Sequence, residues 1–529
     1  MKYLIKQANI VDGSGAAAFV GDILIENKKI VAIEKNIEDA SAEIIMAYGL
    51  TATPGFIDTH SHSDLAAILA PTLSAKIRQG ITTELLGQDG IAPAPLPEKF
   101  ISSWRKNLAG LDGDSDSIDW SYRDTSGYLK MLDQAHAATN LAYLVPHGNV
   151  RMEAMGLDDR PATAEEITTM KNIVRREMEA GAYGLSTGLI YIPCAYAITE
   201  ELVELCKVVA EYSGAFVVHQ RSEADDIINS TNEIIYIAEQ SGANLHVSHI
   251  KVCGKNNWKN IDTMLSLLEA ASRRGIQVSF DQYPYVAGST MLGVILPPWA
   301  HAGGTDKLIE RLADPEMRRA IERDIATGLP GWDNFVDFAG LEQIFVTSVL
   351  SEKNQGCVGM NLVQLGDFFA REPLDATMQL LMEENNAVGM VDFYGNEEHL
   401  IKFLTHPFQN VCTDGLMSPG KPHPRVYGAF PRVFGKYVRE ERALTLEQAV
   451  RKMSGRQADV FGFAERGYLR SGYFADVVLL DDKVIGDNGT YVAPEQFPSG
   501  IKYVFVNGAI AVKNDSETGV GAGMVLRRQ

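Results

Sequence analysis

The sequence predicts an α/β protein whose main part is a (β/α)8 TIM-like barrel. In the middle of the chain, short apolar strands alternate with amphipathic helices, whereas both ends carry strands and turns only. A long helical stretch interrupts the alternation before the last barrel strand. We therefore expect three parts: a small β-sandwich domain from residues 1–53 and 467–529, a barrel over 54–466, and a lid subdomain inserted at 286–409.

Both chain ends show the same sequence pattern, in which runs rich in Ile and Val are separated by turns. In the N-terminal part the predicted strands are Tyr3–Ile10, Asp22–Glu26 and Ile30–Ile33. Near the C-terminus, Asn507-Gly508 separates the apolar runs Gly500–Val506 and Ala509–Val512. Asn-Gly between two such runs is a strong hairpin signal, so both ends are expected to form one β domain.

Eight apolar segments in the middle of the chain are candidate barrel strands. They are Pro54–His62, Thr82–Gly87, Leu141–Pro146, Ala182–Leu189, Ala215–Arg221, Asn244–Lys251, Gln277–Tyr283 and Asn410–Asp414. Helices follow them: Leu202, Leu205, Cys206 and Val209 recur at helical spacing before Gly214. Eight strand–helix units favour a closed parallel barrel, although an open doubly wound sheet shows the same alternation.

The segment between the seventh and eighth strands is too long for one crossover helix. Helical patterns over Asp306–Thr327 and Ala376–Asn385 fill part of it. This predicts an inserted subdomain that covers the mouth of the barrel as a lid.

Composition limits the functions that this chain can have. Its 48 basic and 68 acidic side chains give a net charge of −20, which repels nucleic-acid phosphates and anionic membranes. No apolar run reaches the length of a membrane span. Five scattered cysteines suit a reducing compartment, so we expect a soluble, cytoplasmic protein that binds a small molecule. The oligomeric state stays open, a homo-oligomer included.

Chemically active side chains gather at the ends of the predicted strands. The first strand ends with His60 and His62, which share a face of an extended segment. His219 ends the fifth strand, and Asp414 ends the eighth. In the sixth, alternation places His249 inward and His246 toward the helices, as a structural residue. Active sites of barrels lie at these strand ends, and histidines clustered with a carboxylate are normally neutralised by a metal ion.

The chain resembles the metal-dependent amidohydrolase superfamily and, within it, the N-acyl-D-amino-acid deacylase (D-aminoacylase) group. The resemblance extends over nearly the whole chain. It rests on the ordered segments PGFIDTHSHSD, LLGQDGIAPAP, GLSTGLIYIP, HQRSE, VSHIK, DQYPYVAGST, CTDG and HPRVYGAFPRV.

The resemblance implies a barrel of the metallo-dependent hydrolase type and a role for each site residue. His219 and His249 would hold the main divalent ion, usually zinc, and His60, His62 and Asp414 would form a second or weaker site, giving about one or two ions per chain. Asp414 would take a proton from the attacking water and later pass it to the leaving amine.

The loop after the second strand departs from the family pattern. The family has a metal-binding cysteine within an N-C-G triplet, whereas this chain has Gln88-Asp89-Gly90. A carboxylate binds divalent ions, so Asp89 is the expected substitute ligand; the alternative is that Asp89 only caps the turn before Gly90. The fourth strand, GAYGLSTGL, has no lysine that could be carbamylated to bridge two metals.

The expected substrate is an N-acyl amino acid, most favourably of D configuration, whose linear amide bond is hydrolysed. The side chains expected to bind it, mainly through its carboxylate, are Lys251, Tyr283, Arg425, Tyr191 and Arg221. Two alternatives remain among enzymes: a cyclic-amide hydrolase of the hydantoinase or dihydroorotase type, and a dipeptidase. A third alternative is a catalytically inactive scaffold. The presence of all five expected metal-site residues disfavours it; these are His60, His62, His219, His249 and Asp414.

Overall fold

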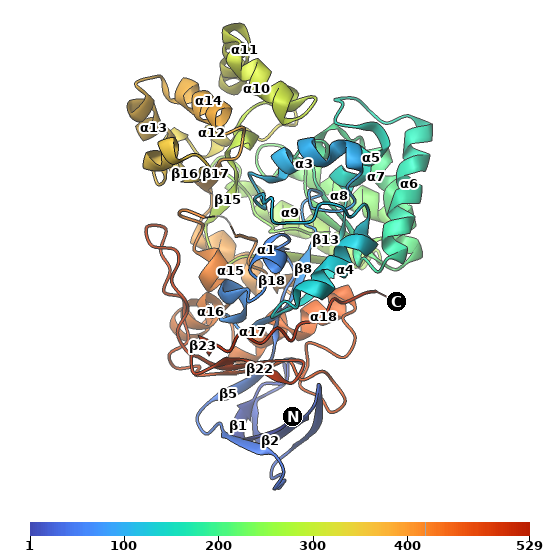
Figure 1. Cartoon of the computed structure of the whole chain (residues 1–529), viewed down its shortest axis with the longest axis vertical. Coiled ribbons are helices and arrows are strands. Elements are labelled where there is room, and N and C mark those ends of the chain that lie inside the picture. The colour runs from blue at the N-terminus through green and yellow to red at the C-terminus, as the bar shows by residue number, and fades with distance from the viewer. Residues whose placement is uncertain (418, 529) are drawn as a thin grey trace.

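The computed structural model describes residues 1–417 and 419–528, and its centre is a closed parallel barrel (Figure 1). Three of the eight barrel positions are each shared by two short strands. The barrel strands are β6 (Phe56–Asp58) with β7 (Ser61–His62), β8 (Ile81–Leu86), β9 (Asn140–Tyr143) with β10 (Val145–Pro146), β11 (Gly184–Gly188), β12 (Ala215–His219), β13 (Asn244–Val247), β14 (Val278–Gln282) and β18 (Gln409–Val411) with β19 (Gly415–Leu416).

Pairing between the last and the first strand closes the barrel. β8 pairs with β6 and β9, and a continuous row runs from β10 through β14 to β18. β19 then pairs in parallel with β7, where Gly415 lies opposite Ser61. This closure confirms the barrel and excludes the open doubly wound sheet.

The helices around the barrel bury the apolar faces that the sequence pattern predicts. They include α6 (Ala164–Glu179), α7 (Thr199–Glu211), α8 (Ile227–Ser241) and α9 (Ile261–Arg273), which cover β10 to β14. In α7, all four residues of the predicted stripe are buried: Leu202, Leu205, Cys206 and Val209. Inside the barrel, Ile57, Leu85 and Val217 pack in one cluster with Phe461 and Phe463.

Both chain ends form one nine-stranded sheet, which confirms the predicted β domain at the bottom of Figure 1. Its strands are β1 (Lys2–Ile10), β2 (Phe19–Glu26), β3 (Lys29–Glu34), β4 (Glu43–Met46), β5 (Thr51–Pro54), β20 (Val477–Leu480), β21 (Ile501–Val506), β22 (Ala509–Lys513) and β23 (Ser516–Glu517). β5 pairs antiparallel with β20 and so joins the two ends. The hairpin at Asn507-Gly508 lies between β21 and β22, as predicted.

The inserted segment forms the upper lobe of Figure 1 and combines helices with a small sheet. β15 (Ala287–Met291), β16 (Ile344–Ser348) and β17 (Gly389–Phe393) pair antiparallel, a sheet that the helical patterns did not predict. The predicted helix over 306–327 is two helices, α10 (Thr305–Ala313) and α11 (Pro315–Thr327), because the proline at the start of α11 cannot continue α10.

The remaining helices of this lobe are α12 (Phe335–Phe338), α13 (Leu362–Phe369) and α14 (Pro373–Glu383). The last part of the expected lid range contains α15 (Glu397–Thr405), which packs against the barrel strand β18. The separate lobe therefore ends before α15. Among the described residues, no helix combines the length and apolar character needed to cross a bilayer.

Candidate metal centre and active site

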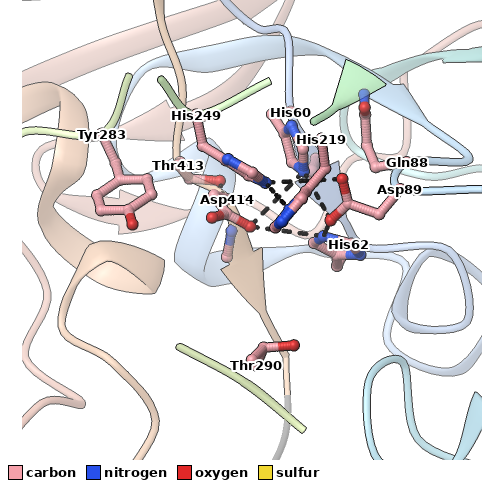
Figure 2. Close-up of polar contacts among 12 residues, drawn as sticks. His60, His62, Gln88, Asp89, His219, His249, Tyr283, Thr290, Thr413 and Asp414 are labelled. Carbon is pink, nitrogen blue, oxygen red and sulfur yellow. Dashed lines mark hydrogen bonds and ion pairs between the residues drawn. The ribbon is translucent and has the colours of Figure 1, made fainter. Parts of the chain in front are cut away.

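His60 and His62 reach the interior of the barrel mouth through a bend in the first strand. In β6, Ile57 faces the barrel interior, while Asp58 binds Lys76 and Thr413 on the other face. Strict alternation from Ile57 would turn both histidines outward. A bend at residues 59–60 shifts the alternation by one residue, so that both rings point into the site (Figure 2). The predicted common face is correct, but the bend rather than an unbroken strand produces it.

His219 and His249 lie together, and the His249 ring is also next to that of His60. His219 ends β12, and its Nδ1 is 2.9 Å from Nε2 of His249. β13 ends at Val247, before the predicted end, and His249 has a φ of 35°, so a loop turn places this histidine. Glu223 lies beside both rings, 3.6 Å from His219 Nε2 and 3.3 Å from His249 Nδ1.

Asp89 lies in the middle of the histidine cluster and is almost fully buried (Figure 2). Its Oδ2 is 3.5 Å from His60 Nε2 and 3.6 Å from His62 Nε2, and its Oδ1 is 3.6 Å from His249 Nε2. These imidazoles lower the pKa of Asp89 well below its usual value, although burial alone would raise it. An ionised carboxylate thus stands between the two predicted metal positions.

Asp414 completes the ring of donors from the last barrel strand. Its Oδ1 is 3.7 Å from His60 Nε2 and 3.5 Å from His62 Nε2. Its Oδ2 forms an ion pair of 2.9 Å with Arg425, whose guanidinium is buried. Burial would raise the pKa of Asp414, but Arg425 and His60 hold it well below its usual value. The carboxylate is therefore ionised at neutral pH and able to accept a proton.

The donor set fits a divalent ion. Three groups bring their donor atoms within 4.8 Å of one another: His60, His62 and Asp414; His60, Asp89 and His249; and His219, Glu223 and His249. Among the described residues, both ring nitrogens of His60, Nε2 of His219 and Oδ1 of Asp89 are buried without a hydrogen-bond partner. Burial lowers the pKa of His219 to about 4, so its imidazole is neutral, as metal binding requires. Unpaired buried donors of this kind are costly unless a cation binds them.

A further layer of side chains holds the candidate ligands. Asp112 Oδ1 is 3.3 Å from His62 Nδ1. Asp281 accepts a hydrogen bond from the backbone N–H of His249 and contacts His246 Nε2 at 2.9 Å. The prediction for His246 is wrong in direction, because its strand neighbour Val217 faces the barrel interior. His246 contacts Asp281 from inside the barrel, where its ring also packs against Phe461.

The cluster opens into a pocket beneath the inserted lobe. Lys251, Tyr283 and Tyr191 line this pocket together with His62, Asp89, His219, His249 and Asp414. The Lys251 ammonium lies 2.8 and 2.9 Å from the Glu223 oxygens and 2.6 Å from His249 Nδ1. The hydroxyl of Tyr283 bonds that of Tyr394 at 2.6 Å. Tyr191 bonds Thr290 at 2.8 Å and presents its ring edge to His219.

The two arginines that were predicted to bind substrate, Arg221 and Arg425, form bonds with protein groups instead. Arg221 forms an ion pair with Glu233 at 2.9 Å and donates to the carbonyls of Ala195 and Ala197, so the structure does not bring it to the pocket. Arg221 was predicted to face the pocket because the strand was expected to extend to it, but β12 ends two residues earlier, at His219. Arg425 lies behind Asp414 and donates to the Ser289 carbonyl at 2.9 Å.

Sequence reasoning missed three carboxylates of the site. Glu223 stands four residues after His219 in the segment HQRSE, and that spacing was the available signal. Asp281 begins the segment DQYPY, where only Tyr283 had been selected. Asp112 comes from an irregular loop with several acidic residues, and nothing in the sequence distinguishes it from Asp114 or Asp116.

Comparisons with known proteins show which family this chain belongs to. The family model described as "Amidohydrolase family" matches residues 43–314 and 403–512. D-aminoacylase from Alcaligenes xylosoxydans xylosoxydans is 33% identical over 99% of this chain and 97% of that protein.

Two solved structures match over 99% of both chains. The N-acyl-D-glutamate deacylase from Bordetella bronchiseptica, complexed with zinc and a phosphonate mimic of the tetrahedral intermediate, has a TM-score of 0.84 and 32% identity. A D-aminoacylase structure described for its binuclear metal centre has a TM-score of 0.84 and 31% identity. The chain therefore belongs to the amidohydrolase family, in the group of D-aminoacylase and the N-acyl-D-amino-acid deacylases.

Proposed function

We propose that this protein is a metal-dependent hydrolase that cleaves the linear amide bond of an N-acyl-D-amino acid. The products are a carboxylate and a free amino acid. The observation that carries the proposal is the ring of buried donors from β7, β12 and the loops next to the barrel strands, with Asp89 and Asp414 facing the same histidines. The relatives that share this fold over their full length are named for the same reaction class.

The proposed cofactor is zinc, with His219, His249 and Asp89 at the main site and His60, His62 and Asp414 at the second. Its support is the binding of zinc by the related N-acyl-D-glutamate deacylase and the donor groups described above. A zinc ion bound there supplies Lewis acidity, which lowers the pKa of water and polarises the amide carbonyl.

Asp414 is the proposed general base and, later, the general acid. It is ionised, and Arg425 and the backbone of His60 fix its position. The carboxylate accepts a proton from the attacking water and then donates it to the nitrogen of the leaving amino acid. Arg425 thus acts on Asp414, which replaces the sequence prediction that it binds substrate directly.

Lys251, Tyr283 and Tyr191 are the proposed binding residues for the substrate. Lys251 gives the pocket a positive charge for the amino-acid carboxylate, and binding requires it to redirect one N–H that now faces Glu223 or His249. Tyr283 offers a hydroxyl on the same wall. The inserted lobe, expected at 286–409, is proposed to act as the lid. The five free, buried cysteines support a cytoplasmic location.

The deciding experiment is a substrate panel with the purified chain after zinc loading. N-acetyl-D-amino acids, their L-enantiomers, dipeptides and hydantoins are incubated with the enzyme, and release of free amine is measured. We expect turnover of N-acetyl-D-amino acids, with the L-enantiomers and cyclic amides at least about tenfold slower.

Asp414→Asn provides the matched control for this panel. It keeps the size of the side chain but cannot accept a proton, so turnover should fall by about three orders of magnitude or more. Zinc at the main site should remain, because Asp414 is not one of the proposed ligands there. Hydantoin or dipeptide turnover exceeding that of N-acetyl-D-amino acids would replace the proposed function with one of the two alternatives.

A further inference from the structure

Asp392 is a buried carboxylate of the pocket wall that the proposed mechanism does not use. It lies on β17, is 3% exposed, and lines the same pocket as His219 and Asp414. Among the residues that the structure describes, its side chain has neither a hydrogen-bond nor an ion-pair partner. A buried charge without a partner is costly, so one that persists in a binding pocket indicates a ligand of opposite charge.

The charges on the pocket wall do not supply that partner. Lys251 is a basic side chain of the wall, but its three N–H groups already face both oxygens of Glu223 and Nδ1 of His249. Arg425 is held by Asp414. A second wall carboxylate, Asp333, accepts hydrogen bonds from Ser222 Oγ and the Glu223 N–H, but it has no ion-pair partner within the described part of the chain.

The backbone opposite Asp392 leaves room for its carboxylate. Gly288 pairs with Asp392 across β15 and β17, and a Cβ at Gly288 would lie 2.9 Å from Asp392 Oδ1. A side chain at position 288 would therefore crowd this oxygen. Burial raises the pKa of Asp392 to about 7, although Lys251 and Arg425 lower it, so a cation in the pocket would favour its ionised form.

We propose that Asp392 recognises a cationic side chain on the amino-acid half of the substrate, an ammonium or a guanidinium. The amino-acid half is indicated because Asp392 lines the same pocket as Lys251, the proposed partner of the substrate carboxylate, and lies close enough for the ammonium to lower its pKa. This inference rests on the proposed function. It makes N-acyl derivatives of basic D-amino acids the preferred substrates, and the acidic wall disfavours D-aspartate and D-glutamate derivatives.

The test compares kcat/KM for N-acetyl-D-lysine and N-acetyl-D-norleucine, which has the same four-carbon side chain without the ammonium. With the zinc-loaded full chain, we expect lysine to exceed norleucine by about 10- to 100-fold, the range for a hydrogen bond to a charged group. N-acetyl-D-glutamate should be slower than norleucine. Equal rates for lysine and norleucine in the wild type would overturn the inference without any variant.

Asp392→Asn should bring the lysine-to-norleucine ratio to about one, because the isosteric amide has no charge. Asp337→Asn is the matched control: Asp337 is an exposed residue of α12 outside this pocket, and its variant should keep the wild-type ratio. An unchanged ratio in Asp392→Asn would assign the lysine preference to another group and overturn the inference. If no N-acetyl-D-amino acid is hydrolysed, the proposed function itself fails.

Discussion

Three residues of the site have backbone conformations that side chains other than glycine rarely adopt. Asp89, His249 and Asp414 have φ values of 54°, 35° and 49°. Each such conformation costs about 1–3 kcal/mol and persists only where neighbouring contacts determine it. Asp281 holds the N–H of His249, and the His60 carbonyl accepts the N–H of Asp414 at 2.8 Å. These contacts therefore fix the backbone at two of the three residues that carry candidate ligands.

The role of Asp89 can be tested with two substitutions that respect its backbone. Asp89→Asn suits the left-handed conformation but lacks the charge, so zinc affinity should fall by at least about tenfold. Asp89→Cys restores the family's thiolate and should keep zinc while raising the preference for softer ions. Metal content after dialysis and chelator competition measure both effects. Unchanged zinc affinity in Asp89→Asn would leave Asp89 as the cap of the turn before Gly90.

At the scale of elements, apolar patterning predicts most strands and helices but not the route by which side chains reach the site. The eight barrel strands and the Asn507-Gly508 hairpin follow from runs of Ile, Val and Leu with turn residues between them. The bend before His60 and the loop turn at His249 depend on contacts with Asp281, which is distant in sequence. The small sheet of the inserted lobe was not predicted, because β15, AGSTM, has a weak strand pattern and is stabilised by pairing with β17.

The loop that carries Asp89 is fixed by α5 (His147–Met155), which follows β10. Asn149 of this helix accepts the Ala92 N–H at 3.2 Å and donates to the carbonyls of Ala92 and Pro95 at 2.7 and 2.9 Å. Asn149→Ala leaves the Ala92 N–H and the Pro95 carbonyl without this partner and should destabilise the chain by about 1–3 kcal/mol. Because the loop loosens, zinc affinity should fall as well.

Urea unfolding of the metal-free chain and chelator competition measure the two effects of Asn149→Ala. Asn229→Ala is the control, since Asn229 is exposed on α8 and bonds only Asp226 at 2.6 Å; a change within about 0.5 kcal/mol is expected. A destabilised Asn149→Ala chain that retains full zinc affinity would show that α5 supports the barrel but not the position of Asp89.

At the scale of the whole molecule, the net charge of −20 opposes the approach of an anionic substrate. The proposed metal ion and Lys251 make the barrel mouth locally positive in an otherwise acidic protein. Asp333 and Asp392 reduce this positive charge, because they place two carboxyl groups on the pocket wall beside the proposed metal centre. A substrate that carries one carboxylate and one cationic group matches this distribution better than a dianion.

The C-terminal tail runs from the β domain to the barrel and bonds it near the beginnings of the strands, at the end opposite the site. Gly523 donates to the Ala137 carbonyl at 2.9 Å, Leu526 donates to the Leu141 carbonyl at 2.8 Å, and Arg528 donates to that of Gly181 at 2.9 Å. All three acceptors lie at or before the beginning of a barrel strand. A Cβ at Gly523 would lie 1.9 Å from the Thr139 carbonyl oxygen, so the tail lies directly against the barrel.

Removing residues 521–529, or substituting Gly523→Ala, should therefore destabilise the barrel without altering the metal centre. We expect a melting temperature at least about 5 °C lower for the truncation, with zinc content per folded chain unchanged. Gly486→Ala is the control, because the nearest atom to its added Cβ is the end of a flexible arginine side chain at 3.7 Å. Loss of zinc at an unchanged melting temperature would contradict this assignment, since it would mean that the tail acts on the site instead of on the barrel base.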